Sequence, residues 1–469
     1  MRKTEVNPDN YTFACVLRAC MEKSDSRGLR VVHGGVVVSG LEPDMTTSSA
    51  LVNAYAKLGQ VEEACNVFNK IAQPDLVLCN SMVTAYGHGG FWDKSLEMFR
   101  EMLKMGIHID GYTLVGLLSG FADPSLLEIC QGIHGLCLKA GFDYNGYVGS
   151  SLVSMYSRCG CLYSGYRVFS SLSQVDLVIW SSLITGFSQS RDYEMAMLLF
   201  KEMNMKGVKG DAILTASVLA ACAKFVVVQP GKEIHGYVFR HGLVLNVMVT
   251  SALIDMYSKC GFAHLGLRVF ETASEKSVVV YNSVITGLGS HGLASQAFGI
   301  FEEMLFKRLI PDQCTFSALL NTCSHAELVK EGCDLFKRME VEFGIAARTE
   351  HYVYMVKLLG MAGELGKAYD LIQKMPNPPD SGVLGALLSC CVVHGNLELG
   401  KIVSSQLSQL EPEKTAYGVM LSNICANDGK WDDVRKLRDD MVGIGLKKSP
   451  GLSRVGDGNV PYSNCNRDI

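Results

Sequence analysis

Apolar residues recur at helical spacing in short segments that glycine separates. In one such segment Met82 and Tyr86 lie four positions apart. Further along, Leu96 and Phe99 lie three positions apart. These spacings predict two amphipathic helices. Gly89 falls between them, where the helical pattern stops, and glycine is typical of a turn. The segment therefore predicts a helix, a turn and a second helix.

This helix-turn-helix pattern repeats along the chain. A shift of 101 residues aligns three blocks and superposes Tyr55, Tyr156 and Tyr257. Each block divides into repeats of 35, 31 and 35 residues, and two variant repeats follow, so that eleven repeats span residues 10–380. One helix hairpin cannot bury its own apolar face, so neighbouring hairpins must stack. The expected fold is all-α, a right-handed superhelical α-solenoid of helix-turn-helix repeats.

Composition and charge argue against a disordered chain, a membrane protein and a broadly basic nucleic-acid-binding protein. Hydrophobic residues reach 48% of the 469 residues and charged residues only 19%, which is too apolar for a disordered chain. No run of eighteen apolar residues is present, so no membrane association is expected. The net charge of −4 argues against a broad basic surface, and any nucleic-acid site has to be local.

Cysteine and histidine residues suggest no metal site or cofactor. The 17 cysteines form no CxxC pair, so reduced thiols are the simpler interpretation. His33, His134 and His235 recur at the 101-residue period. Three stacked hairpins would separate them by about 30 Å, whereas metal ligands converge within about 2 Å of one ion. They are expected to be packing residues of second helices.

The repeats also resemble a known family. Segments such as "LVLCNSMVTAYGHGGFWDKSLEMFREMLKMGIHID" look like pentatricopeptide repeats, and the 35-31-35 alternation resembles the plant P-L-S subfamily. Residues 381–449 resemble its two E motifs. Residues 1–9 resemble the remnant of a preceding repeat, and residues 450–469 form a polar tail.

The resemblance implies base-by-base recognition of single-stranded RNA. In the family, the fifth and the last residue of a repeat contact one base, and an apolar second residue packs against the base face. The implied base-reading pairs are Asn80/Asp110, Ser181/Asp211 and Asn282/Asp312 in the standard repeats and Ser49/Asp75, Ser150/Asp176 and Ser251/Ser277 in the short repeats. The implied base-packing residues are Val77, Val178 and Val279.

By the family's code, Asn with Asp prefers uracil and Ser with Asp prefers guanine. The long repeats carry Ala14, Val115 and Ala216 at the fifth position, and these side chains cannot hydrogen-bond a base edge. We expect the long repeats to act as spacers. The hypothetical target is 5′-G-U-x-G-G-x-(purine)-U, with the first G at Ser49 and the last U at Asp312.

Three basic residues share one position at the end of a first helix. Lys57, Arg158 and Lys259 could reach RNA phosphates from there. The alternative is that they interact with the carboxyl ends of helices. Both interpretations stay open at the level of sequence.

The resemblance further implies an RNA-editing role without catalysis. The HxE and PCxxC elements of a zinc deaminase are not present, so the chain is not expected to be an enzyme. It is expected to choose the cytidine for organellar C-to-U editing and to recruit a deaminase-bearing partner in trans through the E motifs. The expected location is the mitochondrion, with the chloroplast as the alternative; "MRKTEVNP" does not look like a targeting peptide.

Two other functions compete with this hypothesis. An RNA-binding solenoid could stabilise an organellar transcript or support its splicing. A helical-repeat scaffold could instead bind proteins. A scaffold, however, gives no reason for Asn or Ser to recur with Asp at the fifth and last positions.

Overall fold

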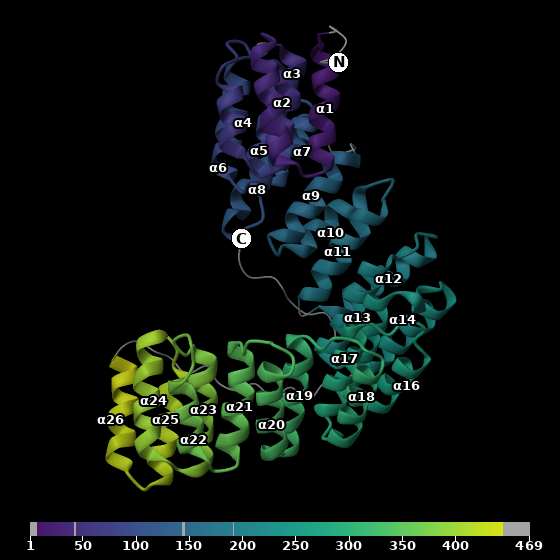
Figure 1. The fold of residues 1–469 in the computed structure, drawn as a ribbon. Coiled ribbons are helices and arrows are strands. Elements are labelled where there is room, and N and C mark those ends of the chain that lie inside the picture. Colours follow the sequence, from purple (N-terminus) through teal and green to yellow (C-terminus); the bar gives the residue numbers. More distant parts are fainter. Residues whose placement is uncertain (1–6, 42–43, 143–145, 191, 444–469) are drawn as a thin grey trace. The chain divides into compact units, whose positions relative to one another are not determined.

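The chain folds into stacked helix hairpins (Figure 1). The computed structural model describes residues 7–41, 44–142, 146–190 and 192–443. Within these ranges there are 26 α-helices, two short 3₁₀ helices and no strand. The α-helices pair in order, and each odd-numbered helix is the first helix of a hairpin. The predicted all-α solenoid of helix-turn-helix repeats is confirmed.

The first helices begin close to the predicted repeat boundaries. They are α1 (Asn10–Glu22), α3 (Met45–Lys57), α5 (Leu76–His88), α7 (Gly111–Ser119), α9 (Gly146–Arg158), α11 (Leu177–Gln189), α13 (Ala212–Phe225), α15 (Val247–Lys259), α17 (Val278–Gly289), α19 (Gln313–Ala326), α21 (Thr349–Met361), α23 (Ser381–His394) and α25 (Ala416–Asn427). The first helices from α1 to α19 begin where the 35-31-35 division, counted from residue 10, places a repeat boundary, and α23 begins at residue 381, where the predicted E motifs start. Residues 1–6 and 444–469, which hold most of the predicted remnant and the whole predicted tail, lie outside the described residues.

The second helices complete the hairpins. They are α2 (Ser26–Val38), α4 (Val61–Phe68), α6 (Trp92–Lys104), α8 (Leu127–Lys139), α10 (Leu162–Ser171), α12 (Tyr193–Met205), α14 (Val228–Arg240), α16 (Ala263–Thr272), α18 (Ala294–Phe306), α20 (Val329–Val341), α22 (Leu365–Gln373), α24 (Leu397–Leu410) and α26 (Trp431–Gly443). The 3₁₀ helices are η1 (Pro124–Leu126) and η2 (Leu243–Leu245).

The chain divides into an N-terminal unit, Met1–Ala252, and a C-terminal unit, Leu253–Ile469. In the N-terminal unit each first helix from α1 to α11 packs against the next first helix, and the apolar residues Leu51, Leu78 and Met82 are buried between them. The C-terminal unit repeats this arrangement from α17 to α25. Each unit therefore buries a core that continues from hairpin to hairpin.

Glycine allows the sharp turn inside the short repeats. Gly59, Gly160 and Gly261 align at the 101-residue period, and each lies just after a first helix with a φ of +73°, +74° and +88°. This left-handed region disfavours residues with a Cβ atom. The conformation lets the chain reverse within a few residues, and the second helix follows at once.

Glycine also permits close contact between α5 and α7. A Cβ atom added to Gly87 would lie 2.7 Å from the carbonyl oxygen of Gly116, and the Cα atom of Gly87 lies 3.1 Å from the ideal Cβ position of Gly120. Oγ of Ser119 is nearer still, but the backbone contacts remain even if that side chain moves, so a larger residue cannot fit without moving a helix.

The recurring histidines link neighbouring hairpins. The Nδ1 atom of His33 lies 2.7 Å from the hydroxyl oxygen of Tyr55, and that of His134 lies 3.0 Å from the hydroxyl oxygen of Tyr156. Burial lowers the pKa of His134. The predicted packing role of these two histidines is confirmed. In the described ranges no group of three or more His, Cys, Asp or Glu side chains is placed to hold a metal ion.

Candidate nucleic-acid interface

The predicted base-reading aspartates occupy helix N-caps. Each carboxylate accepts a hydrogen bond from the backbone N–H three residues later, at the start of the next first helix. The distances are 2.8 Å for Asp75, 2.8 Å for Asp110, 3.0 Å for Asp176, 2.8 Å for Asp211 and 2.9 Å for Asp312. These contacts satisfy backbone donors that a helix start otherwise leaves free. The capping role was missed in the sequence, although an aspartate directly before an apolar helical pattern is its usual signal.

The pair Asn80 and Asp110 forms a hydrogen-bonded group with Thr113. The Nδ2 atom of Asn80 donates to Oδ1 of Asp110 at 3.1 Å. The hydroxyl of Thr113 lies 2.7 Å from Oδ1 of Asn80 and 2.9 Å from Oδ1 of Asp110. The structure therefore brings together the two residues that the sequence predicts as a pair, and it adds a third residue from the following repeat.

The same group recurs 202 residues later in the C-terminal unit. The Nδ2 atom of Asn282 donates to Oδ1 of Asp312 at 3.0 Å. The hydroxyl of Thr315 lies 2.8 Å from Oδ1 of Asn282 and 3.0 Å from Oδ1 of Asp312. Asn282 is only 9% exposed and Thr315 is fully buried. We call these groups the Asn-Asp-Thr triads.

The serine pairs have different surroundings. The Oγ atoms of Ser251 and Ser277 are buried and have no hydrogen-bond partner among the described residues. The hydroxyl of Ser150 donates to the carbonyl oxygen of Gly146 at 2.6 Å. Ser181 has no triad, because Leu214 stands where the triads have threonine. Unsatisfied buried hydroxyls are costly, so they mark positions where a ligand atom would complete the hydrogen bonding.

An exposed valine stands three positions before each fifth residue of the standard repeats, Asn80, Ser181 and Asn282. Val77 is 60% exposed, Val178 is 68% exposed and Val279 is 54% exposed. Five further large apolar residues occupy the same second position of their repeats and are also exposed; these are Tyr11, Tyr112, Tyr147, Ile213 and Met248. Base-packing residues were predicted only for the standard repeats, although position two of these other repeats carries the same apolar signal in the sequence.

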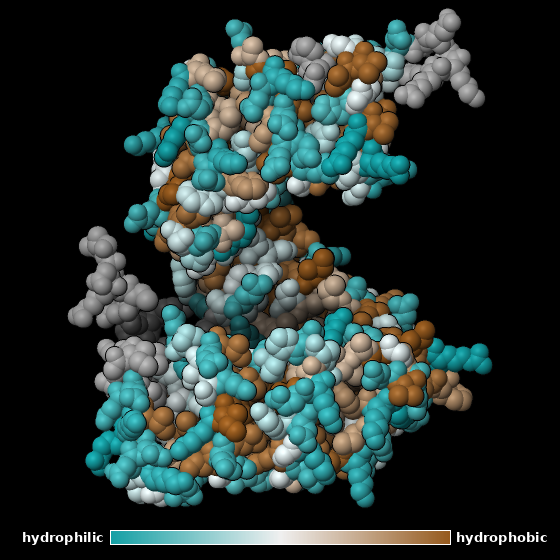
Figure 2. Space-filling view, turned by 60° about the vertical axis from the view of Figure 1, so that its left-hand side comes forward, coloured by the Kyte–Doolittle hydropathy of each residue, from teal (hydrophilic) through white to brown (hydrophobic). Residues whose placement is uncertain are grey.

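Large apolar residues are thus exposed at one repeated position of the solenoid. Apolar residues are scattered over the molecular surface among hydrophilic ones (Figure 2). The second-position residues differ from that background because each is tied to the start of a first helix and lies one helical turn before a fifth-position residue. In the standard repeats and in the short repeats with Tyr147 and Met248, an apolar side chain thus stands beside a polar one, which suits stacked, edge-reading recognition of bases.

The three predicted phosphate contacts have three different environments. Arg158 donates from Nη1 to the carbonyl oxygen of Ser119 at 2.9 Å and from Nη2 to that of Leu118 at 3.0 Å. Its guanidinium therefore contacts the carboxyl end of α7, as the alternative interpretation describes. Lys259 pairs with Asp255 at 2.9 Å, and Lys57 is exposed in the last turn of α3.

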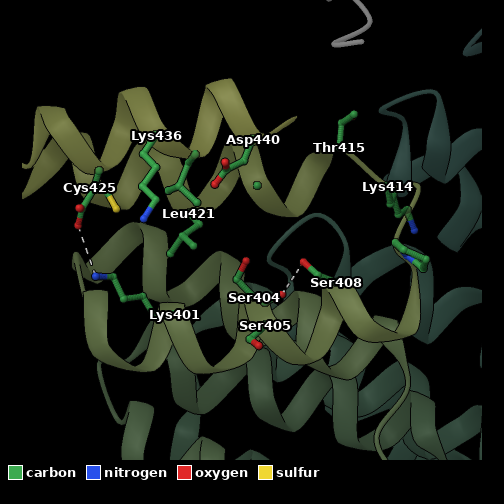
Figure 3. A pocket seen from close by; sticks show the side chains of 14 residues that line it. Lys401, Ser404, Ser405, Ser408, Lys414, Thr415, Leu421, Cys425, Lys436 and Asp440 are labelled. Atoms are coloured by element: carbon green, nitrogen blue, oxygen red, sulfur yellow. Dashed lines mark hydrogen bonds and ion pairs between the residues drawn. The ribbon is translucent and has the colours of Figure 1, made fainter. Parts of the chain in front are cut away.

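A pocket of about 620 Å³ lies among α24, α25 and α26 of the C-terminal unit (Figure 3). Ser404, Leu421 and Lys436 line it, and Lys401 forms an ion pair with Asp433 at 3.4 Å on its border. The pocket combines hydroxyl groups, charges and apolar side chains, which is a composition typical of contacts with another molecule. It lies in the segment that resembles the E motifs.

Two protein-family models for repeats and one for a motif match this chain. The PPR repeat model matches residues 46–73, 178–208 and 314–342, and the PPR repeat family model matches residues 74–123 and 276–325. The E motif model matches residues 394–456. No helix within the described residues is long and apolar enough to cross a membrane.

Similar proteins come from plants. A putative pentatricopeptide repeat-containing protein of Arabidopsis thaliana is 48% identical over 96% of this chain and 82% of its own length. Two others from the same plant, one named mitochondrial and one named chloroplastic, are 34% and 35% identical; the chain covers 66% and 57% of their lengths.

Among solved structures, the pentatricopeptide repeat protein PPR10 in complex with an 18-nt psaJ RNA element has a TM-score of 0.69 and 16% identity. That match covers 94% of this chain and 70% of PPR10, and at this identity it concerns the fold.

Proposed function

Because the chain belongs to the pentatricopeptide repeat family, we propose that it binds single-stranded RNA and selects it by base sequence. The two Asn-Asp-Thr triads carry this proposal. In each, the amide lies one helical turn after an exposed valine and bonds the carboxylate of the last residue of the repeat, so one repeat offers a packing surface and a set of polar atoms to one base.

The triads retain polar atoms for a ligand. Oδ1 of Asp110 accepts from the Thr113 backbone and from Asn80, whereas Oδ2 accepts no hydrogen bond from the described residues. The Nδ2 atom of Asn80 has a second N–H, and its Oδ1 atom has a second lone pair. Uracil offers an N–H between two carbonyl oxygens, so its edge can donate to one of these acceptors and accept from the free amide N–H.

The proposed target is 5′-G-U-x-G-G-x-(purine)-U, with the P-L-S order of repeats setting the spacing. A gel-shift competition tests it with this oligonucleotide and with scrambled versions of equal composition. We expect the scrambled RNAs to compete at least ten times less well. Equal competition by all sequences would mean that the pairs do not select bases.

We further propose that the bound chain directs organellar C-to-U editing, with a deaminase supplied by a partner protein. The E motif match at residues 394–456 supports this role, and the pocket among α24, α25 and α26 is a candidate contact for the partner. Sequencing of organellar RNA from plants that lack the gene provides the test. We expect lost editing at a site a few nucleotides 3′ of the bound sequence. Unchanged editing at every site, with altered transcript ends or introns, would favour stabilisation or splicing instead.

The organelle is proposed from the relatives, one of which is named mitochondrial and another chloroplastic. We propose the mitochondrion. A fluorescent fusion made from a verified 5′ transcript end tests this, and a signal confined to chloroplasts would reverse it.

A further inference from the structure

We propose that Thr113 and Thr315 are positioning residues that set the base preference of the preceding repeat. Each is the third residue of its repeat, and its hydroxyl contacts the fifth-position asparagine of the repeat before it. The proposal deepens the proposed RNA-binding function and rests on it. It adds a position outside the pair of residues that the family resemblance uses for base selection.

The Thr113 hydroxyl lies among three hydrogen-bonding groups, the backbone N–H of Asp110, Oδ1 of Asn80 and Oδ1 of Asp110. The backbone N–H of Asp110 donates to the threonine oxygen at 3.2 Å, so the hydroxyl hydrogen points away from that N–H. Its nearest acceptor is Oδ1 of Asn80 at 2.7 Å, and the carboxylate oxygen is farther at 2.9 Å. The hydroxyl therefore holds the oxygen side of the amide.

The carboxylate holds the other side of the same amide. Nδ2 of Asn80 donates to Oδ1 of Asp110 at 3.1 Å. If the amide rotated by half a turn, its oxygen would face the carboxylate oxygen, and the Thr113 hydroxyl would lose the amide oxygen as its acceptor. Threonine and aspartate together thus fix which end of the amide donates and which accepts.

A fixed amide discriminates between the two pyrimidines. Uracil presents an N–H flanked by carbonyl oxygens, whereas cytosine presents an amino group beside an acceptor nitrogen. A free amide can rotate and exchange its donor and acceptor ends to suit either base. An amide held in one orientation cannot adapt in this way. Loss of the hydroxyl should therefore relax the choice between uracil and cytosine at that one base.

Other repeats of the chain show which fifth residues occur with and without the threonine. Both fifth-position asparagines in the standard repeats have the threonine, whereas the serine repeat has Leu214 at the equivalent place. Thr47 occupies the same third position and bonds Asp44 through its backbone at 2.9 Å and its hydroxyl at 2.8 Å. The fifth residue of that preceding repeat is Ala14, so this hydroxyl has no amide to orient. Thr47, Thr113 and Thr315 are all fully buried.

The test compares variants of the full chain for binding to two RNAs that differ only in the second base, uracil or cytosine. Thr113→Val removes the hydroxyl with little change in shape, and Thr113→Ser retains it. Thr47→Val is the matched control, because it removes an equally buried cap hydroxyl. We expect Thr113→Val to reduce the uracil-over-cytosine ratio about 3- to 10-fold, the range of one hydrogen bond. Thr113→Ser should restore the ratio. Thr47→Val should lower the melting temperature to a similar extent without altering the ratio.

The possible outcomes distinguish failure of the threonine positioning role from failure of the proposed base selection. If the unaltered chain shows no preference for uracil at the second base, base selection itself is wrong. If the unaltered chain prefers uracil and Thr113→Val keeps the full preference, or weakens binding to both RNAs equally, the positioning role is overturned. Should Thr113→Val fail to fold, Thr315→Val gives the same decision at the last base of the target.

Discussion

Exchange of one asparagine and one serine between two standard repeats should rewrite the RNA target. The variant carries Asn80→Ser and Ser181→Asn, and the composition of the chain stays the same. By the proposed code, its best target changes from 5′-G-U-x-G-G-x-(purine)-U to 5′-G-G-x-G-U-x-(purine)-U. Only two bases exchange, so the total charge and length of the RNA are constant.

The structure indicates that the exchange leaves the fold intact. Asn80→Ser removes the hydrogen bond to Asp110 and the contact with Thr113, which together are worth about 1–3 kcal/mol. The N-cap bond from the Thr113 backbone to Asp110, at 2.8 Å, does not depend on the amide and remains. A serine already occupies the equivalent place at position 181. The fold should therefore survive the loss.

The exchange should change the preference between the two RNAs more than it changes the affinity for RNA in general. A base-edge contact discriminates by about 1–3 kcal/mol, or about 5- to 150-fold per base. Fluorescence anisotropy with both RNAs and both proteins gives four dissociation constants. Each protein should prefer its own RNA. The gain at position 181 should be the smaller one, because Leu214 there provides no hydroxyl to orient the new amide.

One result would refute the reasoning directly. If the exchanged protein melts at nearly the same temperature and still prefers the original RNA, the fifth residues do not select bases. A loss of affinity for both RNAs to the same extent would lead to the same conclusion, because it would indicate damage to a general binding surface.

The remaining predictions concern stability and are measured by thermal or urea unfolding. Gly87→Ala should destabilise the chain by about 1–3 kcal/mol, because its Cβ atom would meet the Gly116 backbone. Gly132→Ala is its control; with no atom within 4 Å of its Cβ, it should be neutral or stabilising, and equal behaviour of the two variants would contradict the packing argument. Asp75→Ala should cost about 1 kcal/mol through loss of the N-cap, whereas Asp75→Asn should retain most of the stability; an alanine variant as stable as the parent would exclude the capping role. Burial lowers the pKa of His134, so the folded chain binds fewer protons than the unfolded chain, and stability should fall as the pH drops below about 6.5. His134→Phe, which cannot be protonated, should reduce that pH dependence, and an unchanged slope would show that His134 does not contribute to it.

Much of the fold was predictable from the sequence because its signals are local. Helical spacing, turn glycines and the 101-residue period all lie within one repeat or between copies of one repeat. Gly59, for example, marks a turn whether or not its neighbours in space are known. The need to bury one face of each hairpin then implies stacking. The fifth, last and second positions of each repeat were identified in the same way, through the register of the repeats.

Only the tertiary structure decided what those positions contact. Thr113 meets Asn80 across 33 residues, and Arg158 meets Ser119 across 39 residues. These contacts depend on the spacing and rotation of two packed first helices, which no periodicity within one repeat specifies. For that reason the sequence predicted only the pair Asn80/Asp110, whereas the structure shows a triad that also includes Thr113. The sequence also left the role of Arg158 open. The structure directs that side chain to the carboxyl end of α7, because helix packing brings the carbonyl groups of its last turn within reach of the guanidinium.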